Sequence, residues 1–437
     1  MGDIINKKDP RFTGIVHLWD LPEEKVCLSL DKDYAIKLLN IARNFVDGKW
    51  NKLAKVLGLK IPKDKSSTAI RQMRRTNIVG LYVIKKLSKF LVSKGCEEYN
   101  LEEIEKKLIL IKSRGGPAKP IYYPKFPINF NTKEGAIIIS SMFHDGGISV
   151  RDLEPFYSNN SDILKERFHN AVKNLVGNID IISKKKCYKE LNYPKILGLI
   201  LITLGLIPGK RPINNPKFPE FVFNYSEDLI CEFLSQSIAD DGWVYCPKKS
   251  FGYVGFNFTV DLTKFPEEFR QKIRNEKIIG YIPNVLIGNK KLFEQLGLLV
   301  EGVYFSNEKR YFKDGKEKRY TQEWQMCIRD PRSLNFLSKK LEIPLTYNQE
   351  KLVEIANRER VVKRFHPKLL KIILEFGGIA TCRDVEKKAG KSRMLRYRLN
   401  NLCKDGFLKR INFKGKNRAR YSFLLTEKGK KELELLN

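Results

Sequence analysis

Residues 120–127 read PIYYPKFP, and residues 212–219 read PINNPKFP. Each copy leads into an apolar segment that ends in an Asp-Gly pair, at Asp145-Gly146 and at Asp241-Gly242. A unit written twice in one chain predicts two similar structural repeats that are related by an approximate two-fold axis. If the apolar segments are helices, each repeat delivers one carboxylate at the end of its helix. We therefore expect the two acids to meet near the axis, a layout that suits metal ions and a two-fold-like ligand such as duplex DNA.

The charge of the chain is strongly positive. Its 437 residues carry 82 Lys and Arg against 50 Asp and Glu, which gives a formal net charge of +32. The basic residues are spread along the whole length, and 42% of the residues are hydrophobic, enough for several folded domains. This excess favours a polyanionic partner, nucleic acid before membrane, because phosphate contacts release counterions. The alternative explanation is a general bias toward lysine in a thermophilic or salt-adapted proteome.

The cysteines and the apolar runs bear on the compartment. Eight cysteines are scattered, without a CxxC pair or histidines at zinc spacing. The longest apolar run, residues 196–207, is too short to span a bilayer, and no signal sequence precedes it. We expect reduced thiols, no membrane partner and a cytoplasmic protein.

The N-terminal part predicts a helical domain over residues 1–112. A short helix over 53–59 ends at a glycine, and after a polar break residues 67–90 carry apolar residues at helical spacing. This pattern is typical of a helix-turn-helix, although any basic helical hairpin looks similar. The second helix would present three arginines to DNA: Arg71, Arg74 and Arg75.

The C-terminal part, residues 365–437, predicts a winged helix-turn-helix. Three helices are expected over 367–376, 381–389 and 392–404, followed by a hairpin over 407–425. Lys and Arg outnumber Asp and Glu by more than two to one in this part, which suits a third helix in the major groove and a wing on phosphates. A domain that docks only on proteins would rarely be so basic. The DNA contacts expected from the third helix and the wing are Arg393, Arg396, Arg398, Lys414, Lys416 and Arg418.

Between these parts the pattern predicts an α+β core. A Gly/Pro linker is expected at 113–120, the first repeat at 121–229 and the second at 230–355. In the second repeat, residues 243–262 alternate like a β-hairpin, with Lys248 and Lys249 at its turn as further DNA contacts.

The two Asp-Gly segments, residues 138–146 and 234–242, resemble the LAGLIDADG motif of homing endonucleases, and their separation is similar to that of the single-chain, two-motif members. Residues 204–210, LGLIPGK, resemble the family segment that leads into the second motif. The resemblance covers roughly residues 120 to 350. It implies a duplicated αββαββα core shaped as a pseudo-two-fold saddle, a monomer that binds double-stranded DNA, and two motif helices that pack at its centre.

The resemblance also implies a site-specific DNA endonuclease. Hydrolysis of a phosphodiester needs a nucleophilic water and a stabilised leaving oxygen, and two hard cations held by carboxylates serve both ends. Asp145 and Asp241, with backbone carbonyls, would bind Mg²⁺ and act as the catalytic acids. The lysine that assists near the metals in the family corresponds best to Lys210.

Other features favour a different function. Where the family packs its motif helices through small residues, this chain has Ser140 and His144 in the first motif and Gln236 and Asp240 in the second. No second lysine corresponds to Lys210. The alternative to a nuclease is therefore a catalytically inactive, nuclease-derived regulator of transcription, and a role in RNA maturation is a third hypothesis. His144 is expected to pack or to form hydrogen bonds rather than bind a metal, because no second ligand lies at a suitable interval.

Overall fold

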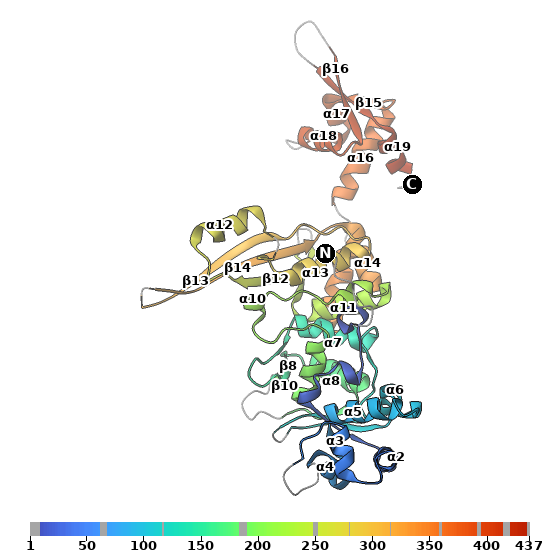
Figure 1. Cartoon of the computed structure of the whole chain (residues 1–437). Coiled ribbons are helices and arrows are strands. Elements are labelled where there is room, and N and C mark those ends of the chain that lie inside the picture. Colours follow the sequence, from blue (N-terminus) through green and yellow to red (C-terminus); the bar gives the residue numbers. More distant parts are fainter. Residues whose placement is uncertain are drawn as a thin grey trace, which may run out of the picture. The chain divides into compact units, whose positions relative to one another are not determined.

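The chain divides into two compact units, residues 1–356 and 357–437, which are described separately below. The computed structural model (Figure 1) describes residues 9–61, 68–115, 118–182, 190–247, 252–278, 280–314, 316–357, 361–390, 395–413 and 420–434. The fold mixes helices and strands in both units, as predicted. Among the described helices, none is both long enough and apolar enough to cross a membrane.

The N-terminal part of the first unit packs helices beside a sheet. Its elements are α1 (Pro10–Thr13), β1 (Ile15–Val16), 3-10 turns at Leu18–Asp20 and Glu23–Lys25, β2 (Val26–Leu30), α2 (Lys32–Asn44), α3 (Trp50–Val56), α4 (Thr68–Thr76), β3 (Ile78–Gly80), α5 (Leu81–Val92), a 3-10 turn at Glu97–Tyr99, α6 (Leu101–Glu105) and β4 (Leu108–Ser113). The antiparallel sheet has the order β3-β2-β4-β5-β9. Its last two strands, β5 (Ile121–Tyr122) and β9 (Asn178–Ile179), come from the predicted first repeat. The predicted linker at 113–120 thus connects two neighbouring strands of one sheet.

One predicted helix in this part was wrong. Residues 67–90 do not form a single helix: α4 ends at Thr76, and β3 separates it from α5. Asn77 has a φ of 53°, a left-handed conformation that asparagine tolerates better than most residues and that ends a helix. The apolar spacing continued across this break, which hid it from the sequence pattern.

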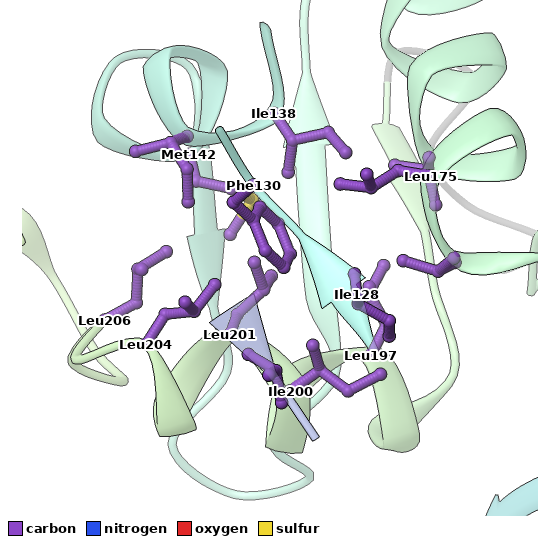
Figure 2. Packing of buried hydrophobic residues seen from close by; sticks show 14 of the residues in the cluster. Ile128, Phe130, Ile138, Met142, Leu175, Leu197, Ile200, Leu201, Leu204 and Leu206 are labelled. Carbon is purple, nitrogen blue, oxygen red and sulfur yellow. The ribbon is translucent and has the colours of Figure 1, made fainter. Parts of the chain in front are cut away.

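The middle of the first unit contains β6 (Ile128–Asn129), α7 (Lys133–Phe143), β7 (Gly146–Ile148), β8 (Pro155–Ser158), α8 (Asp162–Val176), β10 (Glu190–Asn192), α9 (Lys195–Thr203) and α10 (Arg211–Asn214). The strands β10, β8 and β7 form one antiparallel sheet in that order. Figure 2 shows how the core forms: Ile138 and Met142 of α7, Leu175 of α8 and Leu197 of α9 point toward Phe130. All of these side chains are buried.

The last part of the first unit contains a 3-10 turn at Glu220–Asn224, α11 (Glu227–Asp240), β11 (Gly242–Tyr245), β12 (Tyr253–Asp261), α12 (Glu267–Glu276), α13 (Asn284–Gln295), β13 (Tyr304–Lys313), β14 (Lys316–Ile328), α14 (Pro331–Lys340) and α15 (Thr346–Asn357). Its antiparallel sheet has the order β11-β12-β14-β13. The predicted hairpin over 243–262 is confirmed as β11 and β12, with Gly242 opposite Phe256. The order of helix followed by antiparallel strand pair matches α7, β7 and β8.

The second unit consists of α16 (Val361–Glu375), β15 (Ile379–Thr381), α17 (Cys382–Ala389), α18 (Leu395–Lys404), β16 (Leu408–Phe413), β17 (Arg420–Leu425) and α19 (Glu427–Glu434). Its antiparallel sheet has the order β15-β17-β16, and it has a hydrophobic core of its own. The three predicted helices and the hairpin are confirmed to within six residues at their ends. The sequence pattern missed β15 and α19. The predicted wing tip, with Lys414, Lys416 and Arg418, lies outside the described residues, as does Arg393.

Candidate acidic centre and nucleic-acid interface

The two motif helices, α7 and α11, pack against each other through small polar side chains. The hydroxyl oxygens of Ser140 and Ser237 lie 2.9 Å apart, and each also lies 2.9 Å from the carbonyl oxygen of Phe233. Both serines are completely buried. Each helix starts at a capping hydroxyl, Thr132 for α7 and Ser226 for α11, which accepts a backbone N–H of the first turn. Because serine is small, the helices approach closely, and the hydrogen bonds satisfy the hydroxyls that this approach buries.

Their close packing brings the two motif acids together. Asp145 follows the end of α7 and Asp241 follows the end of α11, and both are half-buried. Burial raises the pKa of Asp145 to about 7, and the negative charge of Asp241 contributes further to this rise. Burial also raises the pKa of Asp241. Asp241 is thus near enough to Asp145 to affect its pKa, whereas the catalytic and metal-binding roles of the two acids stay predictions.

Each of these carboxylates already accepts a hydrogen bond from a side chain. The Asn159 amide donates to Oδ2 of Asp145 over 2.6 Å. The Arg211 guanidinium donates through Nη1 to Oδ2 of Asp241 over 3.4 Å, and the same nitrogen donates to the Phe143 carbonyl over 2.6 Å. Arg211 thereby bridges the end of α7 and the acid that follows α11. Its positive charge lowers the pKa of both acids, against the effect of burial.

Lys210, the residue matched to the family lysine, lies next to this arginine in the sequence. It occupies the position before α10, and its side chain is exposed. Within the described residues, its side chain forms no hydrogen bond and no ion pair. Arg211 is the basic residue that contacts the acidic centre. The sequence pattern did not predict it, because Lys210 is the residue that matches the family motif. The role of Lys210 stays a prediction.

A third acid, Asp240, lies beside the pair and was not among the predicted site residues. The Tyr157 hydroxyl donates to its Oδ1 over 2.6 Å, and the Gln236 amide donates to the same oxygen over 3.0 Å. Its Oδ2 is buried and has no hydrogen-bond partner within the described residues. Burial raises the pKa of Asp240 to about 8, and the charge of Asp145 adds to this effect. Three acids therefore share the centre with one guanidinium.

His144 confirms its predicted role in packing and hydrogen bonding. Its Nδ1 lies 2.6 Å from the Ser140 carbonyl oxygen, and the Asn289 amide donates to its Nε2 over 3.2 Å. The first contact requires a proton on Nδ1 and the second requires a lone pair on Nε2, which together define the neutral ring. Burial lowers its pKa to about 3. Since both nitrogens have partners, His144 stabilises the helix end that leads to Asp145.

A Mg²⁺ ion between Asp145 and Asp241 would need carboxylate oxygens and a backbone carbonyl as ligands. The Phe143 carbonyl and one oxygen of Asp241 accept hydrogen bonds from Arg211 instead, and one oxygen of Asp145 accepts from Asn159. A dication at this place would also lie against the guanidinium. In this arrangement Arg211 and Asn159 already bond oxygens that the expected Mg²⁺ ion would use, and the Mg²⁺ site itself stays a prediction.

A pocket of about 340 Å³ opens beside this centre. It is bounded by α10, β12, β14 and the start of α13. Asp241 and Arg211 of the acidic centre line it together with Glu323 of β14. Its lining mixes charged, amide and apolar side chains: Arg211, Pro212, Asn215, Pro216, Asp241, Asn257, Phe258, Thr259, Pro283, Val285 and Glu323.

The basic residues predicted to contact DNA are placed as follows. Arg71, Arg74 and Arg75 are exposed on α4, and the last two occupy its final turn rather than its start. Arg396 and Arg398 lie on α18, where Arg396 is exposed and Arg398 is half-buried. Lys248 and Lys249 lie outside the described residues.

No protein-family model matches the chain. A comparison with curated proteins also finds no match. The solved structures that are similar to it include full-length DUF199/WhiA from Thermatoga maritima, with 13% sequence identity and a TM-score of 0.28, covering 63% of this chain and 92% of that chain. They also include the N-terminal LAGLIDADG domain of DUF199/WhiA, with 12% identity and a TM-score of 0.23, covering 55% of this chain and 88% of that one. At this level of likeness, the function has to come from the residues of the site itself.

Proposed function

We propose that this chain is a sequence-specific double-stranded DNA-binding protein with a LAGLIDADG-like core, and that it acts as a nuclease-derived regulator of transcription rather than as a nuclease. The observation that carries this proposal is Arg211, whose guanidinium bonds both Asp241 and the Phe143 carbonyl. A side chain of the protein itself thus supplies positive charge where a nuclease would hold a metal ion. Arg211 then links the end of α7 to the acid that follows α11.

Three further features support DNA as the partner. The net charge of +32 is large, and basic side chains are exposed on α4 and on α18. The second unit pairs a basic helix with an antiparallel hairpin in the order typical of a winged helix-turn-helix. The two motif helices pack at the centre of the first unit, with an antiparallel strand pair after each. These features suit a long duplex site contacted in several segments by a monomer.

The test starts with selection of the preferred duplex from a random library by the purified chain. Binding to that duplex is then measured by electrophoretic mobility shift at several salt concentrations, with a scrambled duplex as the control. We expect a preference of at least about 10³-fold for the selected site. We also expect the Asp145→Asn/Asp241→Asn double variant to bind as well as the unmodified chain. Equal affinity for selected and scrambled duplexes would refute sequence-specific binding.

A second candidate, a Mg²⁺-dependent site-specific endonuclease, is favoured by one observation. Asp145 and Asp241 interact strongly enough for the charge of one to raise the pKa of the other, which is expected of two acids that share a metal site. Cleavage would then require Arg211 to leave Asp241 when DNA and metal bind. Defined double-strand breaks that depend on Mg²⁺ and on both acids would establish this function in place of the regulator.

A further inference from the structure

A second charged pocket lies in the N-terminal part of the first unit, on the elements α2, α3 and α4. It has a volume of about 260 Å³. Its lining residues are Lys32, Ala35, Ile36, Leu39, Asn40 and Arg43 of α2, Trp50 of α3, Met73, Arg74 and Arg75 of α4, and Asn77. None of the acids of the centre described above lines this pocket.

The charges of this pocket are all of one sign. Lys32, Arg43, Arg74 and Arg75 line it, and no Asp or Glu does. Within the described residues, none of these four cations has a carboxylate partner. Other basic residues of the same region are paired: Lys52 with Asp47, Lys106 with Glu103 and Arg114 with Glu24. Four cations that converge without an anion repel one another, so the pocket gains stability when an anion enters it.

An indole ring holds two of the guanidiniums at the pocket. The Cζ of Arg43 lies 4.8 Å from the centre of the Trp50 ring, and the Cζ of Arg74 lies 4.6 Å from it. Such contacts are cation–π interactions, which orient a guanidinium and reduce its freedom before any ligand binds. The Nε of Arg43 is buried and, within the described residues, has no hydrogen-bond acceptor. The remaining N–H donors of two pre-oriented guanidiniums match the geometry of a phosphate, which takes bidentate hydrogen bonds.

Stabilisation of helix ends explains only part of this arrangement. Arg74 and Arg75 lie in the last turn of α4, where positive charge interacts favourably with the helix dipole. Lys32, however, is the first residue of α2, where the dipole favours an anion and where Asp31 and Asp33 already supply negative charge, so the helix dipole does not explain this lysine. The buried floor, formed by Ala35, Leu39 and Met73, provides an apolar surface for the organic part of a ligand.

We propose that this pocket binds the phosphate group of a phosphate ester. The ester belongs either to a free phosphorylated small molecule or to the backbone of a bound nucleic acid, and the chemistry of recognition is the same for both. Phosphate binding by the pocket does not depend on the acidic centre, although its DNA-backbone source rests on the proposed DNA-binding function. It also gives Arg74 and Arg75 a ligand other than base edges, which the predicted recognition helix would have read.

The experiment compares two arginines of one helix. Arg74→Gln removes a pocket guanidinium, whereas Arg71→Gln is the matched control, because Arg71 is exposed on α4 but does not line the pocket. Binding of inorganic phosphate and of a nucleoside monophosphate to the full chain is measured by isothermal titration calorimetry. We expect Arg74→Gln to weaken phosphate binding by about tenfold or more, as lost charge-assisted hydrogen bonds do, and Arg71→Gln to leave it unchanged. Arg74→Lys, which keeps the charge but loses the bidentate fork, should fall between the two.

A second arm distinguishes the two sources of the phosphate. If the ester belongs to DNA, inorganic phosphate competes with the duplex for the pocket. Arg74→Gln then lowers the slope of log affinity against log salt by about 0.9, whereas Arg71→Gln leaves this slope unchanged. If the ester belongs to a free molecule, Arg74→Gln weakens binding of the nucleoside monophosphate and leaves the salt slope of DNA binding unchanged. Arg75→Gln replaces Arg74→Gln should the latter unfold, as judged by circular dichroism.

Two results would overturn the proposal: no saturable phosphate binding by the unmodified chain, or equal losses in Arg71→Gln and Arg74→Gln. Failure of the proposed DNA-binding function would give a different result: the chain would show no preference for any duplex, while phosphate binding and its dependence on Arg74 would persist.

Discussion

Replacement of Arg211 by methionine tests the idea that this side chain acts as the internal cation of the acidic centre. Methionine keeps much of the volume and removes the charge and all five N–H donors. The substitution leaves Asp241 without its counter-ion and the Phe143 carbonyl without its donor. Mutual repulsion among Asp241, Asp145 and Asp240 is then no longer offset. We expect the variant to fold but to lose stability when the acids are ionised.

The distance between the charges gives the size of this loss. At an effective dielectric constant of about 20, two unit charges 3.4 Å apart interact by about 5 kcal/mol. The Arg211 and Asp241 side chains are 30% and 28% exposed, so solvent screens part of this energy. Desolvation of the ions offsets another part. We therefore expect a decrease of about 2–3 kcal/mol in the free energy of unfolding, including the lost hydrogen bond to Phe143.

The assay is urea denaturation at about pH 8 and at about pH 5.5. The pKa of Asp145 is raised to about 7 and that of Asp240 to about 8, so at the lower pH protons replace the missing guanidinium and the loss should shrink. Lys210→Met is the matched control, because it removes the neighbouring exposed charge and should have little effect at either pH. A loss in Arg211→Met that is the same at both pH values, or is matched by Lys210→Met, would refute the reasoning.

Three other predictions concern the acidic centre and the packing of α9. Asp145→Asn should raise the free energy of unfolding by about 1–3 kcal/mol at pH 8 and by little at pH 4. The reason is that the pKa of this carboxyl is near 4 in the unfolded chain and about 7 in the folded chain, so ionisation destabilises the fold as the pH rises from 4 through 7. Denaturation at both pH values tests this, and a variant that is less stable than the unmodified chain at pH 8 contradicts it. Tyr157→Phe should lower the free energy of unfolding by about 1–3 kcal/mol above pH 8, because the ionised Asp240 then lacks the hydroxyl that donates to it over 2.6 Å. The decrease should be smaller at pH 6, where Asp240 is protonated. The same decrease at both pH values would show that the hydroxyl acts through packing alone. Gly198→Ala should lower the free energy of unfolding by about 1–3 kcal/mol or more, because the new Cβ would lie 1.9 Å from the Leu153 carbonyl oxygen. A thermal midpoint equal to that of the unmodified chain would exclude this close contact.

Much of the centre could be predicted because it is encoded locally. The repeat placed Asp145 and Asp241 at equivalent positions after apolar helices, and two such helices that pack on each other have to bring these acids together. The hairpin formed by β11 and β12 was also predictable, since its strands alternate and pair with a neighbour close in sequence. The same holds for the helices of the second unit.

The partners of the acids could not be predicted, because they are neighbours only in space. Tyr157 reaches Asp240 from β8, 83 positions away in the sequence, and Asn159 reaches Asp145 from the segment after the same strand. Arg211 was overlooked because Lys210 matched the family motif. A signal was available, since Arg211 directly precedes the second repeated octapeptide. The helix break at Asn77 could not be seen in the sequence for another reason: the apolar spacing continues across it, although the backbone of Asn77 adopts a left-handed conformation.

The pocket lined by Arg43, Arg74 and Trp50 shows a further limit of sequence patterns. Its members are scattered over more than forty residues, and each of them alone resembles an ordinary surface cation or a core aromatic residue. Only the fold reveals that the cations converge without an acid. Charge composition could indicate a polyanionic ligand, but not where its phosphates bind.

Incubation of a supercoiled plasmid carrying the selected site with stoichiometric protein and Mg²⁺ tests the central claim most directly. We predict that the plasmid stays supercoiled while the protein remains bound at the site, because Arg211 supplies the positive charge that a metal would bring. Conversion of the plasmid to the linear form, abolished in the Asp145→Asn/Asp241→Asn variant, would contradict the account and identify the chain as an endonuclease.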